Sequence, residues 1–119
     1  MKHSTFTDEQ IAEVCHAANM AVQKLLGDEC PSLEWEDEDE FIRKTSTGEV
    51  QMILAGASPE ETHNEWCERL FDQGYICGLV KSRTMKTHPC LVPFRDLPIE
   101  QKRKVRMIHA IVLALTIDY

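Results

Sequence analysis

The amino-acid sequence predicts a single, mainly α-helical domain with a short β-ribbon. Two segments, beginning at Thr7 and at Ser58, open with the residue pattern that starts helices. The residues after each start place apolar side chains at helical spacing. Turn-forming residues and short β-prone runs are concentrated in residues 75–97. A chain of 119 residues, 43% of them hydrophobic, is long enough for one modest core.

The first helix is expected to begin after Thr7 and to stop at Gly27. Thr7 and Gln10 stand at the spacing of a capping box, and the two acidic residues between them suit the positive end of the helix dipole. Glycine readily adopts the left-handed conformation that ends many helices. One face of this helix collects the apolar residues Ile11, Val14, Cys15, Ala18, Val22 and Leu25.

An acidic segment follows the first helix. A loop over residues 28–33 leads into the run 34–40, which only Trp35 interrupts. Such a run is typical of a solvated linker or of the start of a helix. Apolar residues over 41–54 indicate a second helix, with residues 45–48 as a candidate break.

The next helix has a strong start, with Ser58 as N-cap, Pro59 at the first helical position and Glu61 at the third. This helix is expected to end at Gly74. The side chains that it directs towards the core are expected to be those of His63, Trp66, Cys67 and Leu70.

Beyond this helix, the runs 75–80 and 90–94 are expected to pair as a ribbon, with Pro93 confining the second run to an edge. Pro98 then starts a last helix whose amino-terminal half is basic and whose apolar stripe comprises Val105, Ile108, Val112 and Leu115.

The two halves of the chain echo each other. Glu13, His16 and Gly27 recur at a common offset as Glu60, His63 and Gly74. This recurrence fits a duplicated helical unit. We therefore expect one domain over residues 1–119, with a helical amino-terminal half over about 7–55 and a second half over about 58–119.

The composition excludes several classes of function. A formal charge of −7 argues against nucleic acid and anionic membranes as partners, because both need a basic face. The chain opens with no secretory leader pattern, and its longest apolar run, Ala110 to Leu115, is far too short to span a bilayer. Five cysteines without framework spacing are typical of reduced thiols, so we expect a cytoplasmic location.

Metal binding and catalysis have weak signals. His63 and Cys67 lie one helical turn apart, and His88 and Cys90 follow downstream, so a zinc site stays open as a minor alternative. No recognised ligand spacing is present, and Cys90 beside His88 does not make a defined nucleophile and base. We expect no enzyme activity, no metal and no cofactor.

A cluster of aromatic and basic residues suits a planar anionic ligand. Aromatic rings would stack on a base, and lysine or histidine would meet a phosphate. The competing interpretation makes Trp66 a core residue and leaves the lysines solvated. The cluster comprises Trp66, Tyr75, Lys81, Lys86 and His88.

The sequence resembles the RyR domain, the repeat found in pairs in ryanodine receptors and as standalone proteins in bacteria and bacteriophages. The resemblance rests on Trp66, on Gly74-Tyr75 with Gly78, on the run KTHPCLVPF at residues 86–94, and on Leu97-Pro98-x-x-Gln101-Lys102. The amino-terminal half is similar to standalone members in the pattern that starts Ile11-Ala12 and in Gly27-Asp28 and Trp35-Glu36.

The resemblance implies a mostly helical fold with two related halves and a non-enzymatic module. Paired repeats in the receptors resemble a clamp for an adenine nucleotide, and Trp66 matches the position of the stacking tryptophan. Standalone members are linked to nucleotide-derived signals in phage–host conflict, as sensors or sponges. The sequence departs from the family pattern at Cys77, where an aromatic ring is usual, at Leu70, where a basic residue is common, and at Val105, often acidic.

We therefore expect a module that binds a small, anionic, nucleotide-like ligand, with Trp66 and Tyr75 stacking and His63 lining the site. Its polar contacts would come from Lys81, Lys86 and His88. A homodimer would supply the second half of a clamp. The alternative function is a protein–protein interaction module without a small ligand, acting through the acidic run 34–40 and an apolar strip.

Overall fold

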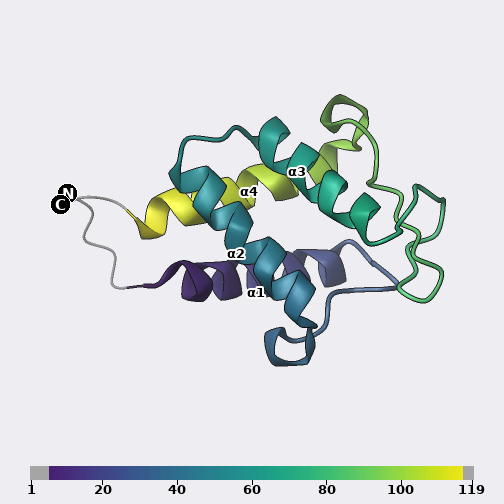
Figure 1. The fold of residues 1–119 in the computed structure, drawn as a ribbon, viewed down its shortest axis with the longest axis horizontal. Helices are drawn as coiled ribbons and strands as arrows, with labels where there is room; N and C mark the ends of the chain where they lie inside the picture. The colour runs from purple at the N-terminus through teal and green to yellow at the C-terminus, as the bar shows by residue number, and fades with distance from the viewer. Residues whose placement is uncertain (1–5, 117–119) are drawn as a thin grey trace.

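The computed structural model describes residues 6–116, and this part of the chain folds into four α-helices and two short 3₁₀ helices (Figure 1). The helices are α1 (Asp8–Leu25), α2 (Glu40–Leu54), α3 (Pro59–Asp72) and α4 (Ile99–Leu115). The 3₁₀ helices η1 (Trp35–Asp37) and η2 (Phe94–Asp96) precede α2 and α4. The mainly helical fold is thus confirmed, while the two ends of the expected 1–119 domain lie outside the described residues.

The predicted helix starts at Thr7 and Ser58 are confirmed as capping boxes. The Gln10 N–H donates to Thr7 Oγ1 over 3.1 Å, and the Thr7 N–H donates to Gln10 Oε1 over 2.9 Å. Ser58 and Glu61 make the same reciprocal pair, at 3.2 and 3.0 Å. These bonds satisfy N–H groups that have no partner within the helix.

The candidate break over residues 45–48 is wrong, because α2 runs through it without interruption. Thr45 is buried, and the Thr47 hydroxyl donates to the Arg43 carbonyl one turn earlier. Gly48 faces α3, where an added Cβ would lie 3.5 Å from Arg69 Nη2. Packing against neighbouring helices overrides the weak helix propensity of these residues.

Two clusters of buried side chains hold the helices together. One joins α1, α2 and α4, and the other joins α3 to the segment after it. The expected apolar face of α1 is only partly buried in the core, because the side chains of Val14 and Leu25 are exposed. The first cluster comprises Ile11, Ala12, Cys15, Val50, Ile53 and Val112; the second comprises Cys67, Leu70 and Leu91.

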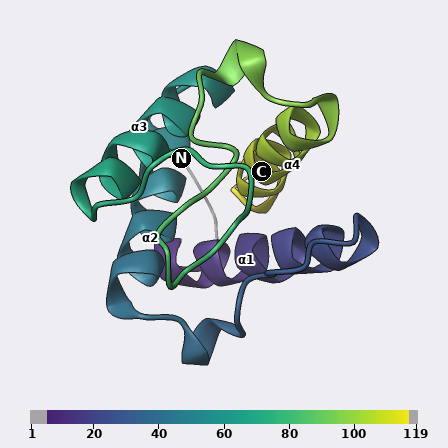
Figure 2. The same ribbon diagram turned by 90° about the vertical axis from the view of Figure 1, so that its right-hand side faces the viewer.

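The expected pairing of residues 75–80 with 90–94 is wrong. Ile76 instead bridges to Thr87, and Thr87 also bridges to Ser82, as isolated bridges without a continuous strand. The Thr87 hydroxyl donates to the Val80 carbonyl over 2.6 Å, which ties the segment into a compact loop. Figure 2 shows the loop extending from α3 across to α4 and down to α1.

Histidine contacts relate the two halves of the fold. His16 of α1 contacts the Leu33 carbonyl through Nε2 at 2.6 Å, two residues before η1. His63 of α3 contacts the Val92 carbonyl through Nε2 at 2.7 Å, two residues before η2. Each histidine also meets the first aromatic ring of its 3₁₀ helix edge-on. The order α-helix, 3₁₀ helix, α-helix therefore occurs twice, as the recurring pattern of Glu, His and Gly in the sequence predicts.

Candidate functional site

A cavity of about 440 Å³ lies among the four helices and is bounded on one side by the loop between α3 and α4. Small-molecule sites in proteins commonly have volumes of 300 to 1,000 Å³. Of the six predicted site residues, five line this cavity: His63, Trp66, Tyr75, Lys81 and His88.

Lys86 does not line the cavity. Its side chain is exposed, and Nζ donates to the Gln73 carbonyl over 2.8 Å, at the end of α3. Its backbone adopts a φ of +55°, which is uncommon for a lysine. Lys86 therefore stabilises the carboxy-terminal end of α3, where carbonyl groups lack partners.

An aromatic cluster forms the α3 side of the cavity. The Trp66 ring stacks on His63 with centroids 5.6 Å apart, and it meets His88 edge-on at 5.0 Å. His63 Nε2 already contacts the Val92 carbonyl and lies 3.4 Å from Cys67 Sγ. His63 therefore fixes the Trp66 ring and the chain before η2, instead of presenting this nitrogen to a ligand.

Two lysines bring positive charge to the cavity wall. Lys81 of the loop donates to Asp28 Oδ2 over 2.8 Å, which links the loop to the segment after α1. Lys104 of α4 lines the same cavity, yet among residues 6–116 it has no hydrogen bond or ion pair. Burial, followed by the repulsion of Lys81, lowers the pKa of Lys104.

His88 is held neutral beside these lysines. Burial and the charges of Lys81 and Lys104 lower its pKa to about 4. Nδ1 accepts a hydrogen bond from the Cys90 N–H at 3.0 Å, which assigns the proton of the neutral ring to Nε2. His88 therefore has a donor available on Nε2.

The wall between α1 and α2 carries polar side chains that have no partner in the part of the chain that the structure describes. Asn19 Oδ1 and Thr45 Oγ1 are buried and make no hydrogen bond within this part. The Glu49 carboxylate makes no hydrogen bond or ion pair with any described residue, and burial raises its pKa to about 7. All three line the cavity. Buried polar groups normally have partners, so this cluster departs from the usual pattern of protein interiors.

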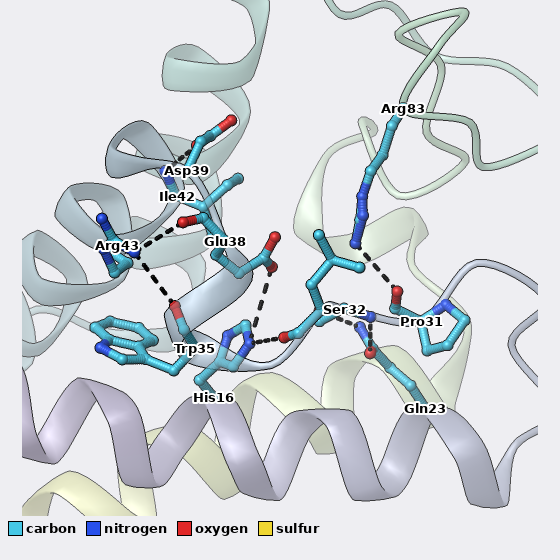
Figure 3. Close-up of polar contacts among 11 residues, drawn as sticks. His16, Gln23, Pro31, Ser32, Trp35, Glu38, Asp39, Ile42, Arg43 and Arg83 are labelled. Carbon is cyan, nitrogen blue, oxygen red and sulfur yellow. Dashed lines mark hydrogen bonds and ion pairs between the residues drawn. The ribbon is translucent and has the colours of Figure 1, made fainter.

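The acidic segment forms another part of the wall and is not uniformly solvated. Glu38 is buried, with Oε2 3.8 Å from His16 Nε2 (Figure 3). Gln23 of α1 accepts from the Ser32 N–H at 2.7 Å and donates to the Ser32 hydroxyl at 3.1 Å. Arg43 donates to the Glu38 carbonyl at 2.8 Å. These bonds hold residues 28–38 against α1 and α2.

Sequence reasoning missed four cavity residues: Asn19, Thr45, Glu49 and Lys104. A signal was present, because each polar residue stands at helical spacing from buried apolar ones. Lys104 precedes Ile108 by one turn on the inner stripe of α4, and Asn19 follows Cys15 by one turn on α1. A polar residue on an inward stripe deserves to be read as a site candidate.

The minor zinc alternative gains no geometric support. Among residues 6–116, no three side chains of His, Cys, Asp or Glu gather at metal-binding distance. Over the same range, no helix is both long and apolar enough to cross a bilayer.

One comparison with known proteins gives a match. The family model described as the RyR domain matches residues 43–117, which is more than half of the chain. No curated protein matches the sequence. The matched region begins within α2 and contains the loop and all six predicted site residues, whereas α1 and Asp28 precede it.

Proposed function

The chain belongs to the RyR domain family, and we propose that it is a non-enzymatic module that binds a small, anionic, nucleotide-like molecule in the cavity among its helices. The observation that carries this proposal is Lys104, a largely buried cation on the cavity wall that makes no hydrogen bond or close ion pair among residues 6–116 and shares the charge of Asp28 with Lys81.

Burying an unpaired ammonium group is costly, because it loses hydration without gaining a counter-charge. An anion in the cavity would supply that counter-charge. Lys81 would strengthen the attraction, since the single negative charge of Asp28 faces two lysine charges. The Nε2–H of His88 would add a neutral donor to the same anion. Lys104 replaces Lys86 in this proposal, because Lys86 bonds elsewhere.

Trp66 and Tyr75 would contact the planar part of the ligand. Both line the cavity and both remain partly exposed. His63 and His88 hold the Trp66 ring in place, so little conformational freedom remains to be lost when a ligand binds.

The state of the three thiols that line the cavity or pack beside it supports binding over catalysis. Burial raises the pKa of Cys90, and it raises the pKa of Cys15 and of Cys67 to about 11. A thiol acts as a nucleophile in its ionised form, which these environments disfavour.

The proposal includes a cytoplasmic location, a homodimer as a means of completing the site, and a sensor or sponge role in phage–host conflict.

A thermal-shift assay with nucleoside monophosphates, triphosphates and cyclic nucleotides at millimolar concentration tests the proposal. A ligand that binds only the folded state raises the melting temperature. We expect a shift for the native chain and for the control Arg103→Gln, and none for Lys104→Gln. The absence of a shift across the panel, or an unchanged shift in Lys104→Gln, would reject the proposal.

One observation favours a second candidate function. The loop exposes four large apolar side chains, and Leu79 is fully exposed. A protein partner could cover them, and Trp66 would then be dispensable. Pull-down of a partner that is lost in Leu79→Ser but kept in Trp66→Ala would favour this function. The exposed residues are Ile76, Leu79, Val80 and Met85.

A further inference from the structure

Three polar side chains of the cavity have no role in binding an anion: Asn19 of α1, and Thr45 and Glu49 of α2. Thr45 is only 7% exposed, and its hydroxyl has no partner within residues 6–116. Over the same residues, Asn19 Oδ1 lacks a partner and no hydrogen bond or ion pair involves the Glu49 carboxylate. A fully buried polar atom such as Thr45 Oγ1 or Asn19 Oδ1 costs about 1 to 3 kcal/mol when it stays unpaired.

These groups face the cavity from adjacent helices. Thr45 and Glu49 are one turn apart on the same face of α2, and Asn19 is one turn beyond Cys15 on α1. Glu49 lies close enough to Cys15 to raise the pKa of its thiol, which places the carboxylate at the α1–α2 interface. We call Asn19, Thr45 and Glu49 the acceptor wall.

The acceptor wall and the lysines occupy different parts of the cavity. The acceptor wall enters the cavity from α1 and α2. Lys81 and His88 come instead from the loop and Lys104 from α4, and these three groups influence one another's pKa. The cavity therefore has an anion-binding end at the loop and α4, and a separate end rich in acceptor oxygens at α1 and α2.

We propose that the ligand carries a hydrogen-bond-donating amino group at the end opposite its anionic group, and that the acceptor wall receives this amino group. This inference rests on the proposed anion-binding function and specifies its ligand class. A carboxylate and an amide oxygen accept hydrogen bonds, and a hydroxyl can do so as well. A carbonyl in the same place would meet acceptors and leave them unpaired.

Pairs of nucleotides that differ by one amino group in place of one carbonyl, and have nearly the same shape, test this inference. We suggest isothermal titration with adenosine and inosine monophosphate, and with cytidine and uridine monophosphate, at pH 8 where Glu49 is ionised. A site that hydrogen-bonds a polar group of its ligand strongly rejects analogues without that group. We therefore expect the nucleotide with the amino group to bind about tenfold tighter or more than its carbonyl counterpart in at least one pair. The control Glu40→Gln, an exposed carboxylate paired with Lys44, should keep this preference.

Two variants assign the preference to the acceptor wall. Glu49→Gln has an amide that can donate as well as accept, so the amino and carbonyl members should bind with similar affinity. Thr45→Val keeps the shape of the side chain and should weaken only the amino member. Lys104→Gln should weaken both members of a pair and leave their ratio unchanged.

The outcomes distinguish this inference from the proposed function. If both members of each pair bind the native chain equally, the acceptor wall does not receive an amino group, while the anion-binding function stands. A preference that persists in both Glu49→Gln and Thr45→Val would also overturn the assignment. If none of the four nucleotides binds, the proposed function fails in its nucleotide form, and this inference fails with it.

Discussion

His16 and His63 make equivalent contacts in the two halves of the fold. Each places Nε2 within 2.7 Å of a backbone carbonyl oxygen that lies two residues before a 3₁₀ helix. Each is buried, at 8% and 5% exposure. The pair shows that these histidines connect a helix to the segment that returns after it, and that His63 supports the site by holding that segment in place.

Replacing His63 by Phe should destabilise the protein, because the Val92 carbonyl loses its nearest donor. We expect a loss of about 1 to 3 kcal/mol in the free energy of unfolding, as for other buried groups left unpaired. His63→Gln, which keeps a donor, should lose less. Urea denaturation followed by tryptophan fluorescence measures both, and equal stability of the Phe variant and the native chain would contradict this role.

Replacing Lys104 by Met should stabilise the ligand-free protein. The methionine fills similar space and removes a buried charge that has no close ion pair among residues 6–116, so we expect a gain of about 1 to 2 kcal/mol. Arg103→Met, at an exposed position of the same helix, should change stability little. A lower melting temperature for Lys104→Met than for the native chain would show that Lys104 serves the fold and not a ligand.

The pH dependence of stability should reveal two opposing contributions. His88 has a folded pKa of about 4, below its unfolded value of 6.5, so its contribution is present above pH 6.5 and is lost as the pH falls towards 4. Glu49 has a folded pKa of about 7, above its unfolded value of 4.5, so its contribution is present below pH 4.5 and is lost as the pH rises towards 7.

Single variants should separate these contributions. Glu49→Gln should become more stable than the native chain as the pH rises from 4.5 to 7, by about 1 to 3 kcal/mol. His88→Asn should gain relative stability as the pH falls from 6.5 to 4. Melting curves over pH 4 to 8 measure both, and parallel profiles for native and variant would contradict the shifts.

Neighbouring charged groups set the background of this experiment. Those around Glu49 are Cys15 of α1 and Glu65 and Arg69 of α3. Those around His88 are Lys81, Lys104, Asp28 and His63. His109, whose pKa burial also lowers, acts in the same direction as His88 in every variant and cancels in the differences.

Gly48→Ala should stabilise the protein by about 0.5 to 1 kcal/mol, because glycine is a poor residue inside a helix. The added Cβ would lie 3.5 Å from the flexible end of Arg69, which is ordinary contact. Gly78→Ala serves as the contrasting variant and should destabilise the protein, because its added Cβ would lie 3.0 Å from Thr87 Cβ and disturb the loop. Destabilisation by Gly48→Ala would mean that α2 and α3 tolerate no added atom there.

The sequence by itself determined the features that depend on residues within one turn of each other. The capping boxes at Thr7 and Ser58 and the stop at Gly27 follow from local hydrogen bonds and backbone preferences, so their sequence patterns suffice. The recurring His16 and His63 pattern and the family motif around His88 were also visible in the sequence, because both are residue patterns that recur, within this chain or across a family. The first pointed to two equivalent contacts and the second to the loop beside the cavity.

Only the tertiary structure decided the features that depend on contacts between distant residues. It kept α2 continuous through Thr45, buried Glu38 within an acidic run and directed Lys86 to the end of α3. It also brought Lys104, Glu49, Thr45 and Asn19 to one cavity. The physical reason is that packing energy and desolvation depend on which surfaces meet, and local residue patterns do not encode that.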